Sequence, residues 1–211
     1  MKKYILIFLI IFTARKTDAQ QISNTVLGEY YLTGVMETAS GFRLNADSTF
    51  DFFFSYGALD RSGKGTWKQE GNKVIFNSKP GTKGFALINS KVADDENITI
   101  KITEENPIFR SHVYAKIKQG QIETDGVTDN NGVVVFPKQS IDSIILVLEF
   151  CPDKFFTFIN KYKEQNHFEF NFEKDIMDVF FEGLTLSINK ENDLEGQHPL
   201  LRPGIYQFKK N

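Results

Sequence analysis

The sequence has little cysteine, little histidine and no run of basic residues. Among its 211 residues there are one cysteine, Cys151, and three histidines. A single cysteine excludes an intramolecular disulfide framework and any metal site built from cysteine alone. The 25 basic residues are outnumbered by 27 acidic ones, for a formal net charge of −2. Because phosphate contacts supply most non-specific nucleic-acid binding, we expect no nucleic-acid partner.

Phenylalanine is abundant, with 21 copies. So many large apolar side chains require burial, which excludes an intrinsically disordered chain. The length is sufficient for one or two domains with proper cores. Cys151 follows the apolar stretch Ile144–Phe150, so we expect it to be buried as a small hydrophobic residue rather than to act as a reactive thiol.

Residues 1–19 have the pattern of a cleavable signal peptide. A cationic start, Met1-Lys2-Lys3, precedes the uncharged stretch Tyr4–Ala14, and Thr17 and Ala19 place small residues before a cleavage site. This stretch is too short for a membrane span of about 20 residues. An uncleaved N-terminal anchor is the alternative. No later stretch is apolar for long enough to cross a bilayer, so we expect an exported protein, periplasmic or secreted.

Alternation of apolar and polar residues predicts an all-β protein. Residues 20–92 are expected to form an antiparallel meander of about five strands. In one of them Phe50, Phe52, Phe54 and Tyr56 share a face. Gly71-Asn72 is a two-residue hairpin signal, because glycine adopts positive φ at low cost.

Two further segments follow the polar joint Ala93–Asn97. Residues 97–150 predict a β-sandwich, and residues 151–211 a C-terminal β segment that is a candidate to complete the first sheet, which would make the sandwich an insertion. The best helix candidate is Pro152–Tyr162, because proline favours a helix start and apolar residues approximate helical spacing. Phe155 to Ile159 also fits a strand.

The middle segment resembles the carboxypeptidase-regulatory-like, transthyretin-like β-sandwich modules of exported bacterial proteins. The resemblance is carried by the strand Ile98–Ile102 and by Gly126–Pro137, in which a Thr-Asp-x-x-Gly turn feeds an apolar strand. In such a turn Asp129 would cap backbone amides, and Gly132 would take the left-handed position. The resemblance implies a module that supports or positions a neighbouring domain and is not itself catalytic.

The segment Gly28–Asn77 resembles small lipocalin-like half-barrels of exported bacterial proteins. The carrying residues are Gly28-Glu29-Tyr30-Tyr31-Leu32, Tyr56-Gly57-Ala58-Leu59-Asp60 and Gly65-Thr66-Trp67. A full lipocalin barrel has eight strands, whereas this segment supplies about five. The resemblance implies a site for a small apolar ligand in the barrel.

Five residues are candidates for ligand binding. Phe52, Tyr56 and Trp67 would form an aromatic pocket wall, although sheet core is the competing interpretation and the one we favour. Asp60 and Arg61 lie in a polar, glycine-rich segment expected to be a loop, where they would contact a polar ligand. An ordinary hairpin loop has the same composition.

We predict no catalytic residue, metal site or cofactor. His112, His167 and His198 are isolated in the sequence. The segment Asp125–Gly132 is rich in oxygen ligands but departs from the calcium-loop template at Val127.

The expected function is that of an exported, non-enzymatic binding or scaffolding protein of the bacterial envelope. Its partner would be another envelope protein or a small apolar ligand. The alternatives are a lipocalin-like carrier of a small apolar or amphipathic ligand, and a hydrolase of unfamiliar type.

Overall fold

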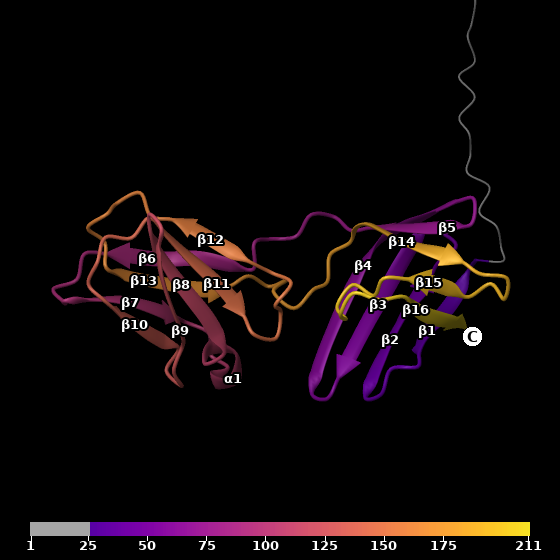
Figure 1. Ribbon diagram of the computed structural model, residues 1–211, viewed down its shortest axis with the longest axis horizontal. Helices are drawn as coiled ribbons and strands as arrows, with labels where there is room; N and C mark the ends of the chain where they lie inside the picture. Colours follow the sequence, from indigo (N-terminus) through magenta and orange to yellow (C-terminus); the bar gives the residue numbers. More distant parts are fainter. Residues whose placement is uncertain (1–25) are drawn as a thin grey trace, which may run out of the picture.

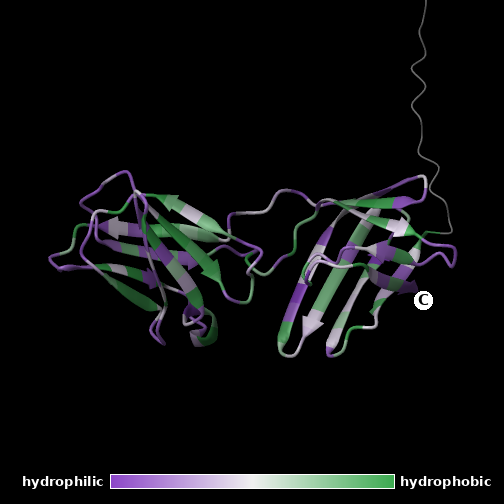
Figure 2. Cartoon of the chain, in the orientation of Figure 1, coloured by the Kyte–Doolittle hydropathy of each residue, from purple (hydrophilic) through white to green (hydrophobic). Residues whose placement is uncertain are grey.

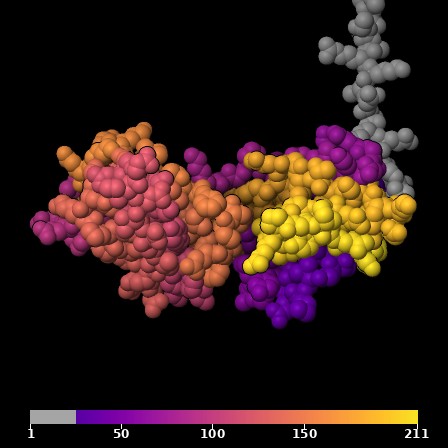
Figure 3. Space-filling model, in the orientation of Figure 1, coloured from indigo at the N-terminus to yellow at the C-terminus, as the bar shows by residue number. Residues whose placement is uncertain are grey.

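The computed structural model describes residues 26–211, so the predicted signal peptide lies outside the described residues. The fold is all-β, as predicted: residues 26–211 form sixteen strands and one four-residue helix. The strands make two lobes, a closed barrel and a β-sandwich (Figure 1). Figure 3 shows the two lobes side by side. Within the described part of the chain, no helix is long and apolar enough to span a bilayer.

Eight antiparallel strands close the barrel in the order β1-β16-β15-β14-β5-β4-β3-β2. Strands β1 to β5, which follow one another in the chain, form the predicted meander. β4 and β5 meet at the predicted Gly71-Asn72 turn, with Gly71 at φ +60°. The barrel strands are β1 (Gly28–Thr33), β2 (Thr38–Leu44), β3 (Thr49–Tyr56), β4 (Leu59–Glu70), β5 (Lys73–Asn77), β14 (Glu182–Ile188), β15 (Leu194–Gly196) and β16 (Tyr206–Lys210).

The two ends of the described chain meet in this barrel. β16 pairs with β1, placing Lys210 opposite Tyr30, and β14 pairs with β5, placing Leu184 opposite Phe76. The five-strand meander alone would leave β1 and β5 as unpaired edges, which favour aggregation. Closure by the C-terminal strands removes both edges. The residues between β5 and β14 are therefore an insertion into the barrel sequence.

The insertion forms two four-stranded sheets, in the orders β10-β7-β13-β6 and β12-β11-β8-β9. β13 pairs with β7 in parallel, and the other pairs are antiparallel. The sandwich extends beyond residues 97–150 on both sides, because β6, β12 and β13 belong to it. Its elements are β6 (Phe85–Lys91), β7 (Asn97–Ile102), α1 (Pro107–Arg110), β8 (Val113–Gln119), β9 (Ile122–Val127), β10 (Val133–Pro137), β11 (Ser143–Leu148), β12 (Phe156–Ile159) and β13 (His167–Phe172).

Apolar and polar residues alternate along the strands, as the green and purple bands of Figure 2 show. The buried residues of both sheets form one sandwich core. Alternate residues are buried along β7 from Ile98, along β8 from Val113 to Ile117, and along β11 from Ile144. Cys151, at the end of this core, is fully buried, as predicted.

The helix predicted for Pro152–Tyr162 was wrong, whereas the alternative of a strand within Phe155 to Ile159 is confirmed: the segment contains a turn and the strand β12. Phe156 and Phe158 point with a period of two toward the aromatic residues of the opposite sheet, including Phe170. The expected loop after Tyr56 is only a two-residue turn, and β4 already begins at Leu59. The inner face of β4 includes arginine and two glycines, which conceals the alternation in the sequence.

Aromatic side chains fill the barrel interior. Phe42, Phe50 and Phe76 are buried with ring centroids 4.7 to 6.3 Å apart. Phe181, from the segment that returns from the sandwich, inserts among them, with its centroid 5.0 Å from Phe50 and 5.2 Å from Phe52. The interior of the barrel is thus a packed core.

The return segment, residues 173–181, is held against the barrel wall by the backbone. Val179 N donates to Ser62 O at 2.7 Å, and Ser78 N donates to Phe181 O at 2.8 Å. Gly63 permits this close approach, because a Cβ there would lie 2.6 Å from Val179 O and 2.7 Å from the Phe181 ring.

Candidate functional site

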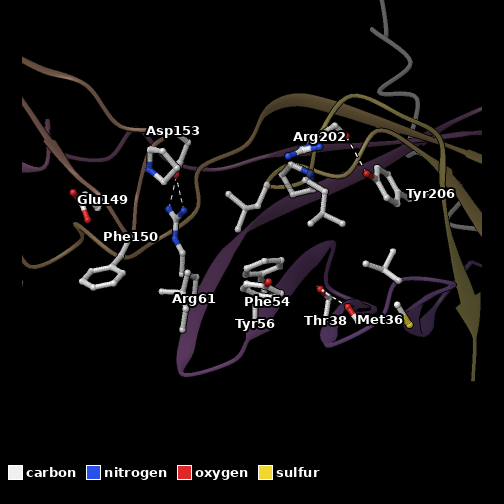
Figure 4. A pocket seen from close by; sticks show the side chains of 16 residues that line it. Met36, Thr38, Phe54, Tyr56, Arg61, Glu149, Phe150, Asp153, Arg202 and Tyr206 are labelled. Atoms are coloured by element: carbon white, nitrogen blue, oxygen red, sulfur yellow. Dashed lines mark hydrogen bonds and ion pairs between the residues drawn. The ribbon is translucent and has the colours of Figure 1, made fainter. Parts of the chain in front are cut away.

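A cleft lies between one end of the barrel and the sandwich (Figure 4). Its volume of about 660 Å³ is typical of a small-molecule site. The walls come from the β1–β2 turn, the β3–β4 hairpin, the β15–β16 loop and the sandwich segment that follows β11. The lining residues are Val35, Met36, Thr38, Phe54, Tyr56, Leu59, Arg61, Glu149, Phe150, Pro152, Asp153, Pro199, Leu200, Leu201, Arg202 and Tyr206.

Apolar side chains from turns and loops dominate the barrel side of the cleft. Met36 is 90% exposed, in a turn flanked by Gly34 at φ +78° and Glu37 at φ +56°. Leu200 and Leu201 are half-buried in the β15–β16 loop. Because such segments usually carry polar residues, these apolar side chains are unexpected there and give the cleft an apolar wall.

Arg61 joins the barrel to the sandwich at one end of the cleft. Its Nη1 and Nη2 donate to Asp153 Oδ1 and Oδ2 at 2.5 and 3.0 Å, and its Nε donates to Met177 O at 3.0 Å. The side chain of Arg61 is 2% exposed, against 33% for Asp153. Paired and hydrogen-bonded in this way, the buried guanidinium is already satisfied, so Arg61 holds the walls of the cleft in place.

Two other charged residues line the cleft, Arg202 and Glu149. Neither side chain forms a hydrogen bond or an ion pair with any residue in the range 26–211. The Arg202 backbone is fixed nonetheless, because its carbonyl oxygen accepts a hydrogen bond from the Tyr206 hydroxyl at 3.0 Å. Because the guanidinium of Arg202 has no partner within residues 26–211, it is available to a ligand.

A buried histidine lies close to the cleft lining. His198 is 1% exposed and stacks on Phe208 at 5.8 Å. Its Nδ1 accepts from Leu200 N at 3.0 Å, so in the neutral ring the proton is on Nε2, which donates to Ser40 Oγ at 3.0 Å. Ser40 in turn donates to Phe53 O at 2.8 Å. Burial lowers the pKa of His198 to about 4.

The hydrogen bond of this histidine–serine pair runs in the wrong direction for nucleophilic catalysis. A general base would have to accept the Ser40 proton through Nε2, but that nitrogen is the donor here, and Ser40 itself is buried. We interpret the pair as a satisfied polar contact of the barrel core. Within residues 26–211, no group of three or more His, Cys, Asp or Glu side chains is placed to hold a metal ion.

The five residues singled out in the sequence separate into three groups. Tyr56 and Arg61 line the cleft. Phe52 and Trp67 lie in the barrel core, 2% and 4% exposed, and are not among the cleft residues. Asp60 is exposed on the outer face of β4.

Sequence reasoning missed most of the cleft. Met36, Leu201 and Arg202 belong to barrel turns, and Phe150 and Asp153 belong to the sandwich. The one local signal was the presence of apolar residues inside turn segments. That signal identifies an unusual loop but not the second lobe that faces it.

Comparison of the chain with protein-family models, with curated proteins and with solved structures gives no significant match. The interpretation of the cleft therefore rests on its own geometry.

Proposed function

We propose that this protein is an exported, non-enzymatic binding or scaffolding protein of the bacterial envelope, and that it binds its ligand or partner in the cleft between barrel and sandwich. The observation that carries this proposal is the cleft itself, with its apolar wall and the unpaired Arg202 at its rim. The signal-peptide pattern of residues 1–19 supports export.

The packed barrel interior favours the cleft over the barrel as the binding site. A lipocalin-like carrier would hold its ligand among Phe42, Phe50 and Phe52, where Phe181 now lies. The eight-stranded barrel supports the likeness to lipocalins in architecture only, and the sandwich supports a module that positions its neighbour.

The cleft also favours binding over hydrolysis. Its acidic residues are Glu149 and Asp153, and Asp153 is engaged by Arg61. No histidine is among the lining residues. An Asp, Glu and His set of the kind that acid–base hydrolysis requires is thus not assembled by the side chains that line the cleft.

Native mass spectrometry of the protein purified gently from its own cells tests the proposal. We expect a stoichiometric small-molecule adduct or a co-purifying envelope protein. Met36→Glu should abolish either, because it places a charge on the apolar wall at a highly exposed position where the fold does not depend on the side chain.

The matched control is Phe155→Glu, which replaces an exposed apolar residue of the sandwich that does not line the cleft. This variant should retain the adduct or partner. An adduct that survives Met36→Glu, or a wild-type protein that carries neither adduct nor partner, would contradict the proposal.

A further inference from the structure

The charges that line the cleft differ in whether they are already neutralised. Arg61 and Asp153 form a closed pair, and the Arg61 Nε is bonded to Met177 O. The two charges therefore neutralise each other and stabilise the contact between the lobes. Within the described chain this leaves Arg202 and Glu149 as the unpaired charges of the lining, one cationic and one anionic.

The two unpaired charges lie in different parts of the cleft. Figure 4 shows Arg202 on the barrel side of the cleft, above Phe54 and Tyr56, whereas Glu149 lies at the sandwich end, beyond the Arg61–Asp153 pair. Arg202 also follows Leu200 and Leu201 directly in the β15–β16 loop. A ligand that packs on the apolar wall therefore lies on the side of the cleft that carries the Arg202 guanidinium, not on the side that carries the Glu149 carboxylate.

A guanidinium beside apolar surface is complementary to one kind of small molecule. Arginine presents several N–H donors in a fork that matches a carboxylate, and such charge-assisted hydrogen bonds are stronger than neutral ones. The neighbouring leucine and aromatic side chains are complementary to an aliphatic tail.

We propose that the cleft binds a small amphipathic carboxylate, whose tail packs against Met36, Leu200 and Leu201 and whose head group pairs with Arg202. This inference rests on the proposed function, because it names the ligand class of the same cleft. Arg202 is the residue that determines head-group specificity.

Three eight-carbon probes test the sign of the head group. Isothermal titration calorimetry with octanoate, 1-octanol and octyltrimethylammonium compares an anion, a neutral molecule and a cation on the same tail. We expect octanoate to bind most tightly and the cation most weakly. Octanoate binding should weaken as salt is added, because the head-group contact is close to solvent.

Variants then assign the preference to one residue. Arg202→Ala should weaken octanoate binding roughly tenfold, which corresponds to the loss of one charge-assisted hydrogen bond. The affinity for 1-octanol should not change. Arg202→Lys should restore most of the affinity, because it keeps the cation. The control Glu149→Gln should leave octanoate binding unchanged or slightly tighter. Arg202 is exposed, so none of its variants is expected to affect folding.

The outcomes separate this inference from the proposed function. If all three probes bind equally and Arg202→Ala has no effect, the head-group assignment is overturned, while the cleft remains a binding site. If no probe binds to the wild type, and the natively purified protein carries neither adduct nor partner, both fail.

Vesicles distinguish a free amphiphile from a membrane head group. We expect the protein not to sediment with vesicles of phosphatidylglycerol. Sedimentation that Arg202→Ala abolishes would overturn the assignment to a free small molecule.

Discussion

Arg61 of the barrel and Asp153 of the sandwich, 92 residues apart in sequence, form a two-bond ion pair across the boundary between the lobes. The same guanidinium donates to Met177 O of the return segment. One side chain thus ties together both lobes and the chain that connects them. Because the cleft is lined by both lobes, this contact maintains its shape.

Removing the carboxylate of this pair should destabilise the protein. Asp153→Ala leaves the Arg61 guanidinium buried without a counter-charge, and we expect a loss of about 2 kcal/mol in the free energy of unfolding, measured by urea denaturation. The matched control is Glu29→Ala, which breaks the ion pair that Arg43 forms on the barrel surface, where the Arg43 side chain is 60% exposed. The control should cost much less, because solvent screens an exposed ion pair. Equal losses would show that the joint contributes no more than a surface ion pair.

Phe181→Ala should be among the most destabilising single substitutions. It removes a buried ring that contacts Phe42, Phe50, Phe52 and Phe76, and we expect a loss of about 3 to 5 kcal/mol in denaturation. The apolar cavity that it leaves should bind benzene. Phe155→Ala, at an exposed position, should change stability by less than about 0.5 kcal/mol. A loss below about 1 kcal/mol for Phe181→Ala would contradict the packed interior.

Stability should fall in mild acid because of His198. Its folded pKa of about 4 lies below the ordinary 6.5, so between these values the unfolded chain binds a proton that the folded protein does not. The contribution of neutral His198 to the free energy of unfolding is fully present above pH 6.5. It is lost progressively as pH falls to about 4, by about 3 kcal/mol in all.

Denaturation at a series of pH values measures this dependence. His198→Gln, which retains a hydrogen-bonding side chain without a titrating ring, should flatten the curve between pH 6.5 and 4. Phe155→Ala, at an exposed position without a titrating group, should leave the shape of the curve unchanged. An NMR titration that gives His198 a pKa near 6.5 would contradict the prediction.

Cys151 should report on the joint between the lobes. Burial raises the pKa of its thiol, and its Sγ lies 3.4 Å from Met177 Sδ in the return segment. We expect an aromatic disulfide reagent to label it roughly a hundredfold more slowly in the folded protein than in urea. Asp153→Ala should accelerate labelling of the folded protein by loosening the return segment. Identical rates in the wild type and this variant would show that the ion pair does not restrain it.

Local sequence determined the strands and several turns. Alternation at Phe50, Phe52 and Phe54 defined a strand and its buried face. Asp129 and Gly132 defined a turn in which Asp129 Oδ1 accepts from Asn131 N and Val133 N, at 2.8 and 2.9 Å, while Gly132 adopts φ +76°. Such features follow from neighbours a few residues apart, so the chain encodes them locally.

The candidate site was only partly predictable. Tyr56 and Arg61 were identified, but Arg61 was assigned to a loop and a ligand, whereas it lies on a strand and bonds to Asp153. The apolar side chains of Leu200 and Leu201 gave no indication of what faces them. A cleft between two lobes depends on how the lobes dock, and no period in the sequence records that.

By itself, then, the sequence determined an all-β fold, the strand faces and the turn chemistry of this protein. Only the tertiary structure decided that β16 closes the barrel against β1, that Phe181 fills its interior and that Phe156 lies on a strand rather than a helix. The physical reason is the same in each case. These choices are made by packing and pairing between residues far apart in the chain, whose contact energies outweigh weak or ambiguous local preferences.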